Sequence, residues 1–347
     1  MLRPFHLVAL TSLGIAGACA SIPIEGDPAI SVFAKAETVP VGTSNDDAAD
    51  DPAIWRNAAE PEKSLIVGTD KKAGLHVYDL QGRELSFLEQ AGLNNVDLVE
   101  MPDGRVLVAA SDRSDLATAY IHLSTLNTAT GALAPLGRVK VGPGEGYGIC
   151  MSSPDAAGNV AIFSAPKNGV IYRTVLTFSG IAFEDRTSEV ASVASQPEGC
   201  VVDNRTNTLY IGEEAAGVWS FDMTSADMGA GKRLVAAVDN RMLVADVEGL
   251  ALFPQGTDGG MLVASSQGDN AYAVYSLPDM KPMGRFRIAA ATYGSTEETD
   301  GIELVSGSFG ALYPGGIFVA QDGQNEPEAQ NFKLVSWADV MEALKPD

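Results

Sequence analysis

The chain has 347 residues, of which 46% are hydrophobic, and a mean hydropathy of +0.06, values that are typical of a packed globular protein. It carries 23 Lys and Arg against 45 Asp and Glu, which gives a formal net charge of −22 at pH 7. A charge this negative argues against binding to nucleic acid or to anionic lipid, both of which require a basic surface. It suits a protein that binds cations, and a solvated acidic surface is the simpler alternative.

The first twenty residues have the pattern of a secretory signal. Arg3 is followed by an apolar run from Leu7 and then by small residues up to Ala20, and this run is too short to span a membrane. Cleavage after Ala20 would leave residues 21–347 as the mature chain, and lipidation of Cys19 is the alternative. The sequence therefore predicts an exported protein, periplasmic or secreted, without a membrane span.

Two cysteines, Cys150 and Cys200, remain in the mature chain, and each lies in an apolar segment. Nothing in the sequence fixes the distance between them, and a disulfide requires a specific separation. Buried free thiols are therefore expected, while a disulfide is the alternative that export makes possible.

Beyond the signal, segments with an acidic or polar residue ahead of small and apolar residues recur about every fifty residues. Asp50 begins the series; taking Asp97, Tyr147, Glu198, Glu248 and Asp300 as equivalent gives steps of 50, 51, 50 and 52 residues. After each anchor come a turn rich in Gly, Asn, Asp and Pro, an apolar strand, and a second strand with β-branched and aromatic residues. The pattern predicts a single all-β domain, a six-bladed β-propeller with about four antiparallel strands per blade.

Two segments lie outside the repeats. Residues 30–41 precede the first repeat and have the pattern of a strand, which we expect to complete the last blade and so latch the ring. Near the C-terminus, apolar residues follow helical spacing behind Ser336, a good N-cap, and predict a short helix. The helical positions are Trp337, Val340, Met341 and Leu344.

The innermost strand of each propeller blade lines the central channel, so the residues that begin each repeat should converge at one mouth. Clustered carboxylates repel one another unless a proton or a cation neutralises them. Calcium takes six to eight oxygen ligands and suits this donor set, whereas His76 and His122 have no ligand-spaced partners for zinc. For each residue alone, a hydrogen bond to a turn amide is the alternative. The converging residues are Asp50, Asp51, Asn94, Asn95, Asp97, Tyr147, Glu198, Glu248 and Asp300, with Glu213 and Glu214 at the end of a neighbouring strand.

Basic residues follow the corresponding strand end in the first three repeats. Together they predict an anion site beside the metal, because Lys and Arg bind phosphate readily, and solvated loop charges are the alternative. The chain has no Cys-x5-Arg loop and no RHG, GxSxG or GxxxxGK[ST] motif, which disfavours covalent catalysis and leaves a metal-activated water. The basic residues are Lys71, Lys72, Arg113 and Lys167.

Nine segments in register, from about Glu37 to Val335, resemble the β-propeller phytases. They include DDPAIW, LNNVDL, EGYGI, EGCVVD, DVEGL and TDGIEL. The resemblance implies a calcium-dependent 3-phytase, a phosphomonoesterase that removes phosphate from phytate (myo-inositol hexakisphosphate). It also implies adjacent cleavage and affinity phosphate sites and a calcium-bridged water as nucleophile.

The resemblance assigns roles to individual residues. The catalytic calcium ions would be held by Asp50, Glu198, Glu214, Glu248 and Asp300, with Asp246 of DVEGL as a further ligand. The phosphates would contact Tyr147, Lys71, Lys72, Arg113 and Lys167. A structural calcium in the channel would be bound by Glu37, Asp51, Asn94 and Asn95.

The chain departs from this family in two places. Asn168 stands where members carry Glu between Lys and Gly. The segment before Asp300 lacks the Asp that supplies a peripheral calcium elsewhere, a role for which Glu297 or Glu298 is the candidate, with Asp322 and Asn325 as the other ligands.

Two other functions remain open at this point. One is another propeller hydrolase, a lactonase or esterase with one calcium in the channel, and the other is a non-catalytic binding propeller that calcium stabilises. Neither requires several carboxylates beside four cations, so a phytase, expected to be monomeric, is the prediction.

Overall fold

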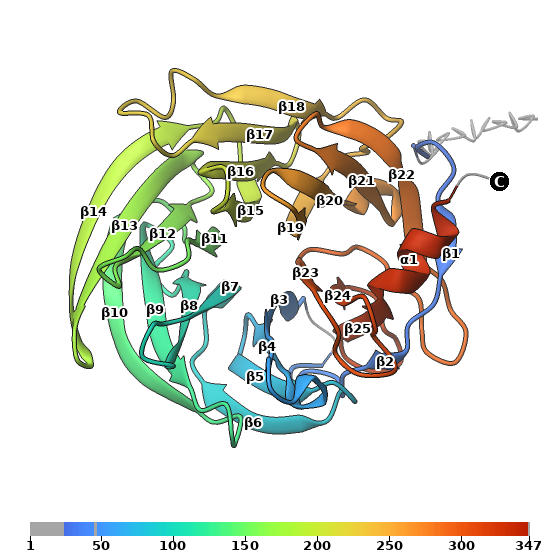
Figure 1. The fold of residues 1–347 in the computed structure, drawn as a ribbon, viewed down its shortest axis with the longest axis horizontal. Coiled ribbons are helices and arrows are strands. Elements are labelled where there is room, and N and C mark those ends of the chain that lie inside the picture. Colours follow the sequence, from blue (N-terminus) through green and yellow to red (C-terminus); the bar gives the residue numbers. More distant parts are fainter. Residues whose placement is uncertain (1–23, 45–46, 346–347) are drawn as a thin grey trace, which may run out of the picture.

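The computed structural model describes residues 24–44 and 47–345, so the predicted signal segment and Cys19 lie outside the described residues. Six sheets surround a central axis as blades, and within each blade the strands follow one another from the centre outwards (Figure 1). This confirms the predicted six-bladed β-propeller. The blades comprise β3 (Ala49–Trp55), β4 (Leu65–Asp70), β5 (Gly74–Asp79) and β6 (Glu84–Glu89); β7 (Leu93–Glu100), β8 (Val106–Asp112), β9 (Thr118–Leu126) and β10 (Leu133–Pro143); β11 (Gly148–Met151), β12 (Val160–Ala165), β13 (Val170–Ser179) and β14 (Ala182–Ser192); β15 (Pro197–Asp203), β16 (Thr208–Glu213), β17 (Gly217–Asp222) and β18 (Arg233–Ala237); β19 (Val247–Gln255), β20 (Gly259–Ser266), β21 (Ala271–Leu277) and β22 (Lys281–Ile288); and β23 (Ile302–Ser306), β24 (Gly316–Asp322) and β25 (Asn331–Ser336).

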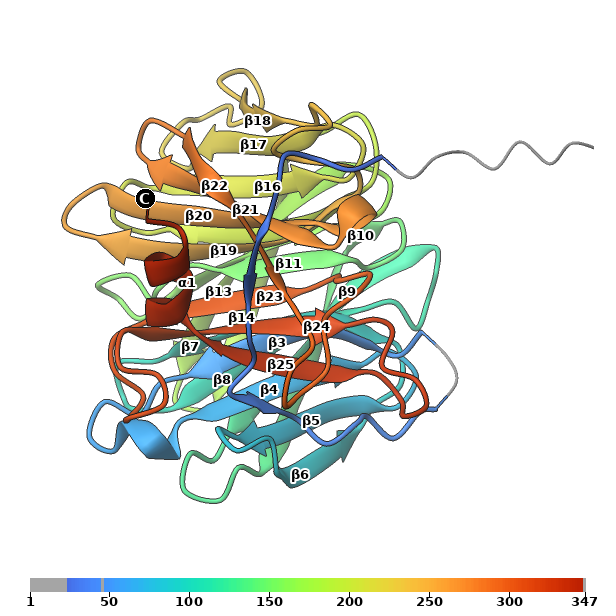
Figure 2. The ribbon, with the colours of Figure 1, turned by 90° about the vertical axis from the view of Figure 1, so that its right-hand side faces the viewer.

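The N-terminal segment contacts two blades. β2 (Ala36–Glu37) pairs antiparallel with β25 and supplies the fourth strand of the last blade, while β1 (Ile30–Val32) pairs parallel with β22 as a fifth strand of the blade before it. Figure 2 shows this segment in blue, running across the side of the ring. The latch expected over residues 30–41 thus differs in detail, because only β2 joins the last blade.

The blades pack face to face through apolar clusters. β4 is buried along its whole length, whereas β6, the outermost strand of the same blade, is largely exposed. Between the last two blades, Tyr272, Phe286 and Phe318 pack together in one core, and Trp337 on the predicted C-terminal helix α1 (Trp337–Ala343) joins them. Among the described residues no helix has the length and apolar character needed to cross a membrane.

Glycines allow the innermost strands to approach one another at the channel. A Cβ atom on Gly148 would lie 2.2 Å from the carbonyl oxygen of Glu198, and one on Gly199 would lie 2.1 Å from that of Glu248. In the same way, a Cβ atom on Gly249 would lie 2.6 Å from Ile302 N, and one on Gly301 would lie 2.2 Å from Asp51 Oδ1. No side chain fits at these distances, so these four positions take glycine. Because the glycines hold neighbouring strands at the same height, the residues that directly precede them lie at one common level of the channel.

The strand register shows that Asp97 does not belong to this level. In β7, Leu93 pairs with Asp112 and Val96 pairs with Ala110, so the two residues between them correspond to Asp50 and Asp51 of the first blade. Asn94, not Asp97, is therefore the equivalent of Asp50. The expected equivalence of Asp97 was wrong because the second repeat is offset by three residues.

A disulfide joins Cys150 of β11 to Cys200 of β15, with their Cα atoms 5.4 Å apart. The expectation of free thiols was wrong. The two cysteines are 50 residues apart, one repeat, so the propeller places them at similar positions on neighbouring innermost strands. The bond ties the third blade to the fourth.

Replacing both cysteines, as Cys150→Ala with Cys200→Ala, should lower the free energy of unfolding by about 2–4 kcal/mol, because a loop of 50 residues is no longer closed in the unfolded chain. Guanidinium unfolding monitored by circular dichroism measures the change. A reductant should destabilise the wild type alone; equal stability of the two proteins without reductant would contradict the expectation.

Candidate active site

One mouth of the channel carries a ring of six polar residues, one from each blade. Four of them, Asp50, Asn94, Glu198 and Glu248, are at most 4% exposed. Each stands at or just before the start of an innermost strand, at the level that the channel glycines define. The ring comprises Asp50, Asn94, Tyr147, Glu198, Glu248 and Asp300.

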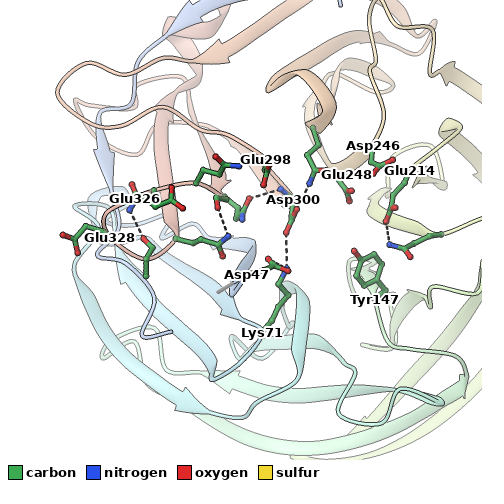
Figure 3. Close-up of a pocket in the computed structure, with 18 residues that line it drawn as sticks. Asp47, Lys71, Tyr147, Glu214, Asp246, Glu248, Glu298, Asp300, Glu326 and Glu328 are labelled. Atoms are coloured by element: carbon green, nitrogen blue, oxygen red, sulfur yellow. Dashed lines mark hydrogen bonds and ion pairs between the residues drawn. The ribbon is translucent and has the colours of Figure 1, made fainter. Parts of the chain in front are cut away.

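The ring opens into a cleft of about 630 Å³ that is lined almost entirely by polar residues. In Figure 3, Glu326 and Glu328 lie at one end of the cleft, Lys71 and Asp300 lie in the middle, and Tyr147 lies at the other end. Glu214, Asp246 and Glu248 gather at that end as well. The cleft therefore gives a large polar ligand direct access to the ring.

Lys71 holds the first blade to the last across the ring. Its Nζ lies 2.9 Å from Asp50 Oδ1, 3.2 Å from Asp300 Oδ2 and 2.8 Å from Asp47 Oδ1. Burial alone would lower the pKa of Lys71, but the carboxylates of Asp50, Asp300 and Asp47 outweigh it and raise this pKa above its usual value. The ammonium therefore stays charged and offsets part of the negative charge on this side of the ring.

A second group of carboxylates has no such partner. Glu198, Glu214 and Glu248 each offer an oxygen, and these oxygens lie within 4.8 Å of one another. Within the described part of the chain, no basic side chain forms an ion pair with any of the three, and Glu198 Oε2 and Glu248 Oε2 are buried without a hydrogen-bond partner. These two oxygens are satisfied only if the two carboxyl groups share a proton or if a cation binds between them.

The protonation of these groups reflects the same shortage of positive charge. Burial, followed by repulsion from Glu198, raises the pKa of Glu248 well above its usual range, and burial raises the pKa of Glu214 to about 7. Asp300 is shifted upwards too, because burial outweighs the effect of Lys71 on its pKa. An oxygen-only donor set with unpartnered buried atoms fits a hard cation such as calcium.

Amide side chains fix one oxygen of several carboxylates in the ring or beside it. Gln196 Nε2 donates to Glu214 Oε1 at 2.5 Å, and Gln267 Nε2 donates to Asp300 Oδ1 at 2.7 Å. Asn94 Nδ2 donates to Asp50 Oδ2 at 2.9 Å. The sequence analysis missed both glutamines, although Gln267 directly follows the second strand of its blade, as Lys71 does in the first.

Basic side chains gather beside the ring on the second and third blades. Arg113 Nη1 donates to Asn94 Oδ1 at 2.6 Å, and Lys167 Nζ lies 4.3 Å from the centre of the Tyr147 ring. Glu145, which the sequence analysis also missed, bridges them, with its Oε1 3.1 Å from Arg113 Nε and 3.6 Å from Lys167 Nζ. Both cations keep about 30% of their side-chain surface exposed, at 28% and 31%, and can contact an anion.

Other predicted residues lie elsewhere. Asp51 and Asn95 line the channel beneath the ring, and burial and the charge of Asp50 raise the pKa of Asp51. Glu213 turns away from the cleft and accepts hydrogen bonds from Ser195 and Trp219. Lys72 is exposed in the turn after Lys71, and Glu298 lines the cleft.

Glu37 does not share a site with Asp51, Asn94 and Asn95, because it lies on β2, the outermost strand of its blade. Its carboxylate pairs with Lys333 at 2.8 Å. Asp322 and Asn325, expected in a peripheral calcium site, also bind Lys333.

Comparison with known proteins gives a consistent result. The sequence model of the phytase family matches residues 5–347. The 3-phytase of Bacillus subtilis (strain 168) is 37% identical over 331 residues, which cover 90% of this chain and 85% of that protein. The crystal structure of BBS1N in complex with ARL6DN, soaked with mercury, aligns with a TM-score of 0.46 at 12% identity, over 80% of this chain and 76% of that one.

In the presence of a chelator, the stability of the protein should fall as the pH rises from about 4.5 to about 7. The folded-state pKa of Glu214 is about 7 against 4.5 for the free group, so in this window the unfolded chain loses a proton that the folded chain keeps. Glu214→Gln should therefore reduce the loss of Tm between pH 5 and pH 8, measured in EGTA. If the variant loses as much Tm between pH 5 and pH 8 as the wild type, the raised pKa of Glu214 is not the cause of the pH dependence.

Proposed function

Since the chain belongs to the phytase family, we propose that the carboxylate ring is the catalytic centre of a calcium-dependent 3-phytase, a phosphomonoester hydrolase that releases phosphate from phytate. The family assignment and the Bacillus subtilis relative support hydrolysis of phytate, and they set aside the lactonase and the binding-propeller alternatives. The observation that carries the proposal is the cluster of Glu198, Glu214 and Glu248 with its unpartnered buried oxygens, two members of which, Glu214 and Glu248, line the cleft.

Electrostatics explains why a metal suits this substrate. Phytate is a dense polyanion and the chain has a net charge of −22, so direct contact is repulsive unless cations lie between them. Calcium bound at the ring would polarise phosphoryl oxygens and acidify a water for attack on phosphorus. The carboxylates that would hold it are Asp50, Glu198, Glu248 and Asp300 of the ring and Glu214 and Asp246 beside it.

The chain's own cations would bind and orient the phosphates. Arg113 and Lys167 lie on one side of the ring and Lys71 on another, an arrangement that suits two adjacent phosphate groups of one substrate, one for cleavage and one for affinity. Lys72 adds a charge at the mouth. Burial and the charge of Glu198 raise the pKa of Tyr147, so its hydroxyl keeps its proton and can donate to a phosphate oxygen.

We further propose that the mature chain is exported and acts as a monomer in the periplasm or outside the cell. The N-terminal signal pattern supports export. The disulfide between Cys150 and Cys200 agrees with it, because structural disulfides persist in oxidising compartments.

Excess EGTA should abolish phosphate release from phytate, and added calcium should restore it. Glu214→Gln and Asp300→Asn should each lower kcat by about 10²–10³-fold while the circular dichroism spectrum is unchanged, because the ring loses a charged oxygen ligand. Glu184→Gln and Asp185→Asn, on the exposed outer strand β14, are the matched controls. Full turnover of the wild-type enzyme in EGTA would refute the proposal.

Lys167→Met should lower kcat/KM for phytate by about 10–100-fold, because a charged group that contacts phosphate is lost. Lys232→Met is the matched control, since Lys232 also lies over an aromatic ring, 5.0 Å from the centre of Trp219, but away from the cleft. Equal effects of the two substitutions would argue against a phosphate contact.

A further inference from the structure

Lys333 on β25 is a fully buried cation outside the carboxylate ring. Its side chain has an exposed fraction of 0%, and its Nζ lies 2.8 Å from Glu37 Oε2 and 2.9 Å from Asp322 Oδ2. Two amide oxygens complete the surroundings, Asn331 Oδ1 at 2.8 Å and Asn325 Oδ1 at 3.0 Å. The ammonium therefore lies at the centre of four oxygens from β2, β24, β25 and the loop between the last two.

Three of these oxygens come from residues to which the family resemblance gives calcium, namely Glu37, Asp322 and Asn325. The distances of 2.8–3.0 Å are those of N–H···O hydrogen bonds, whereas Ca–O bonds measure about 2.3–2.6 Å. A second cation would meet the ammonium charge at the same place. The residues present do not fit a metal while Lys333 occupies their centre.

We propose that the ammonium of Lys333 is the permanent cation of this site, in the place of an exchangeable metal ion, so that the adjoining rim of the cleft is held without calcium. The charges support this, because one buried ammonium neutralises Asp322, which is 1% exposed, and pairs with the half-buried Glu37. A buried carboxylate without such a partner is strongly destabilising.

The rim depends on Asp322 through hydrogen bonds. Asp322 Oδ1 accepts the N–H of Glu297 at 3.1 Å and that of Gln324 at 3.3 Å, and the N–H of Gly323 donates to the carbonyl oxygen of Glu297 at 2.8 Å. Asn325 Nδ2 donates to the carbonyl oxygen of Ala329 at 2.8 Å. Gly323, Gln324, Asn325 and Ala329 all line the cleft, so the ammonium supports one wall of it.

The same ammonium also supports the ring closure. β2 has only two residues, and Glu37 is one of them. Its ion pair with Lys333 adds a side-chain contact to the short backbone pairing of β2 with β25. The N-terminal latch and the cleft wall therefore share one internal cation.

The test compares melting temperatures of full-length variants in EGTA and in calcium. Lys333→Met and Asp322→Asn should each lower Tm in EGTA by roughly 5–10 °C, because each removes one member of a buried ion pair. Asp322→Asn should lower Tm equally in calcium, and equilibrium dialysis should find as many bound calcium ions as in the wild type. Lys35→Met is the matched control. Lys35 forms an exposed ion pair with Asp339, so this variant should have the Tm of the wild type.

Two results would overturn the inference. One is an unchanged Tm of Lys333→Met in EGTA, which would show that the ammonium has no such role. The other is the loss of one bound calcium in Asp322→Asn or in Glu37→Gln, which would show that a metal does use these oxygens. Glu37→Gln changes a half-exposed residue, so this measurement remains available if Lys333→Met does not fold. Neither measurement depends on catalytic activity.

Discussion

The structure depends on one electrostatic constraint, the repulsion among carboxylates that the propeller brings together and removes from water. Each blade contributes one residue to the ring, and the channel glycines bring neighbouring strands so close that these residues cannot spread apart. Glu198 and Glu248 are nearly fully buried, and the raised pKa values of Glu248 and Asp300 show that their charged forms are unfavourable without a counter-charge. In the folded protein these carboxyl groups must therefore be protonated or neutralised by a bound cation. At neutral pH, a cation that prefers oxygen ligands fits best.

The molecule meets this constraint in two ways. At one buried site away from the ring, a lysine side chain supplies the charge, as Lys333 does for Asp322. Where the carboxylates line the cleft, as Glu214 and Glu248 do, or lie directly beneath it, as Glu198 does, no basic side chain pairs with them among the described residues. Lys71 is intermediate, since it pairs with Asp50 and Asp300 yet lines the cleft. On the two proposals above, an exchangeable cation would bind only where an anionic substrate can reach it.

The features that the sequence predicted are those that repeat. The period of about fifty residues identified the six blades, and most of the ring follows from it, because equivalent positions in a propeller meet at one mouth. The errors arose where single repeats deviate or where distant segments pair. Asp97 was chosen because the offset of three residues in the second blade cannot be seen without its hydrogen-bond register. Glu37 was placed in the channel because nothing near it in the sequence indicates that β2 would lie against β25 and Lys333.

The residue that follows the second strand differs in charge from blade to blade, so the two sides of the cleft mouth differ in charge. This position holds Lys71 and Arg113 in the first two blades, but Glu214 and Gln267 in the fourth and fifth. Because these residues follow corresponding strands, the exchange of a basic for an acidic or amide side chain changes the charge at the rim. If the ring binds a metal as proposed, one side of the mouth would attract phosphate directly and the opposite side only through that metal. A substrate that carries several phosphates on one small ring would then contact both sides at once, and this asymmetry would favour it over a simple monoester.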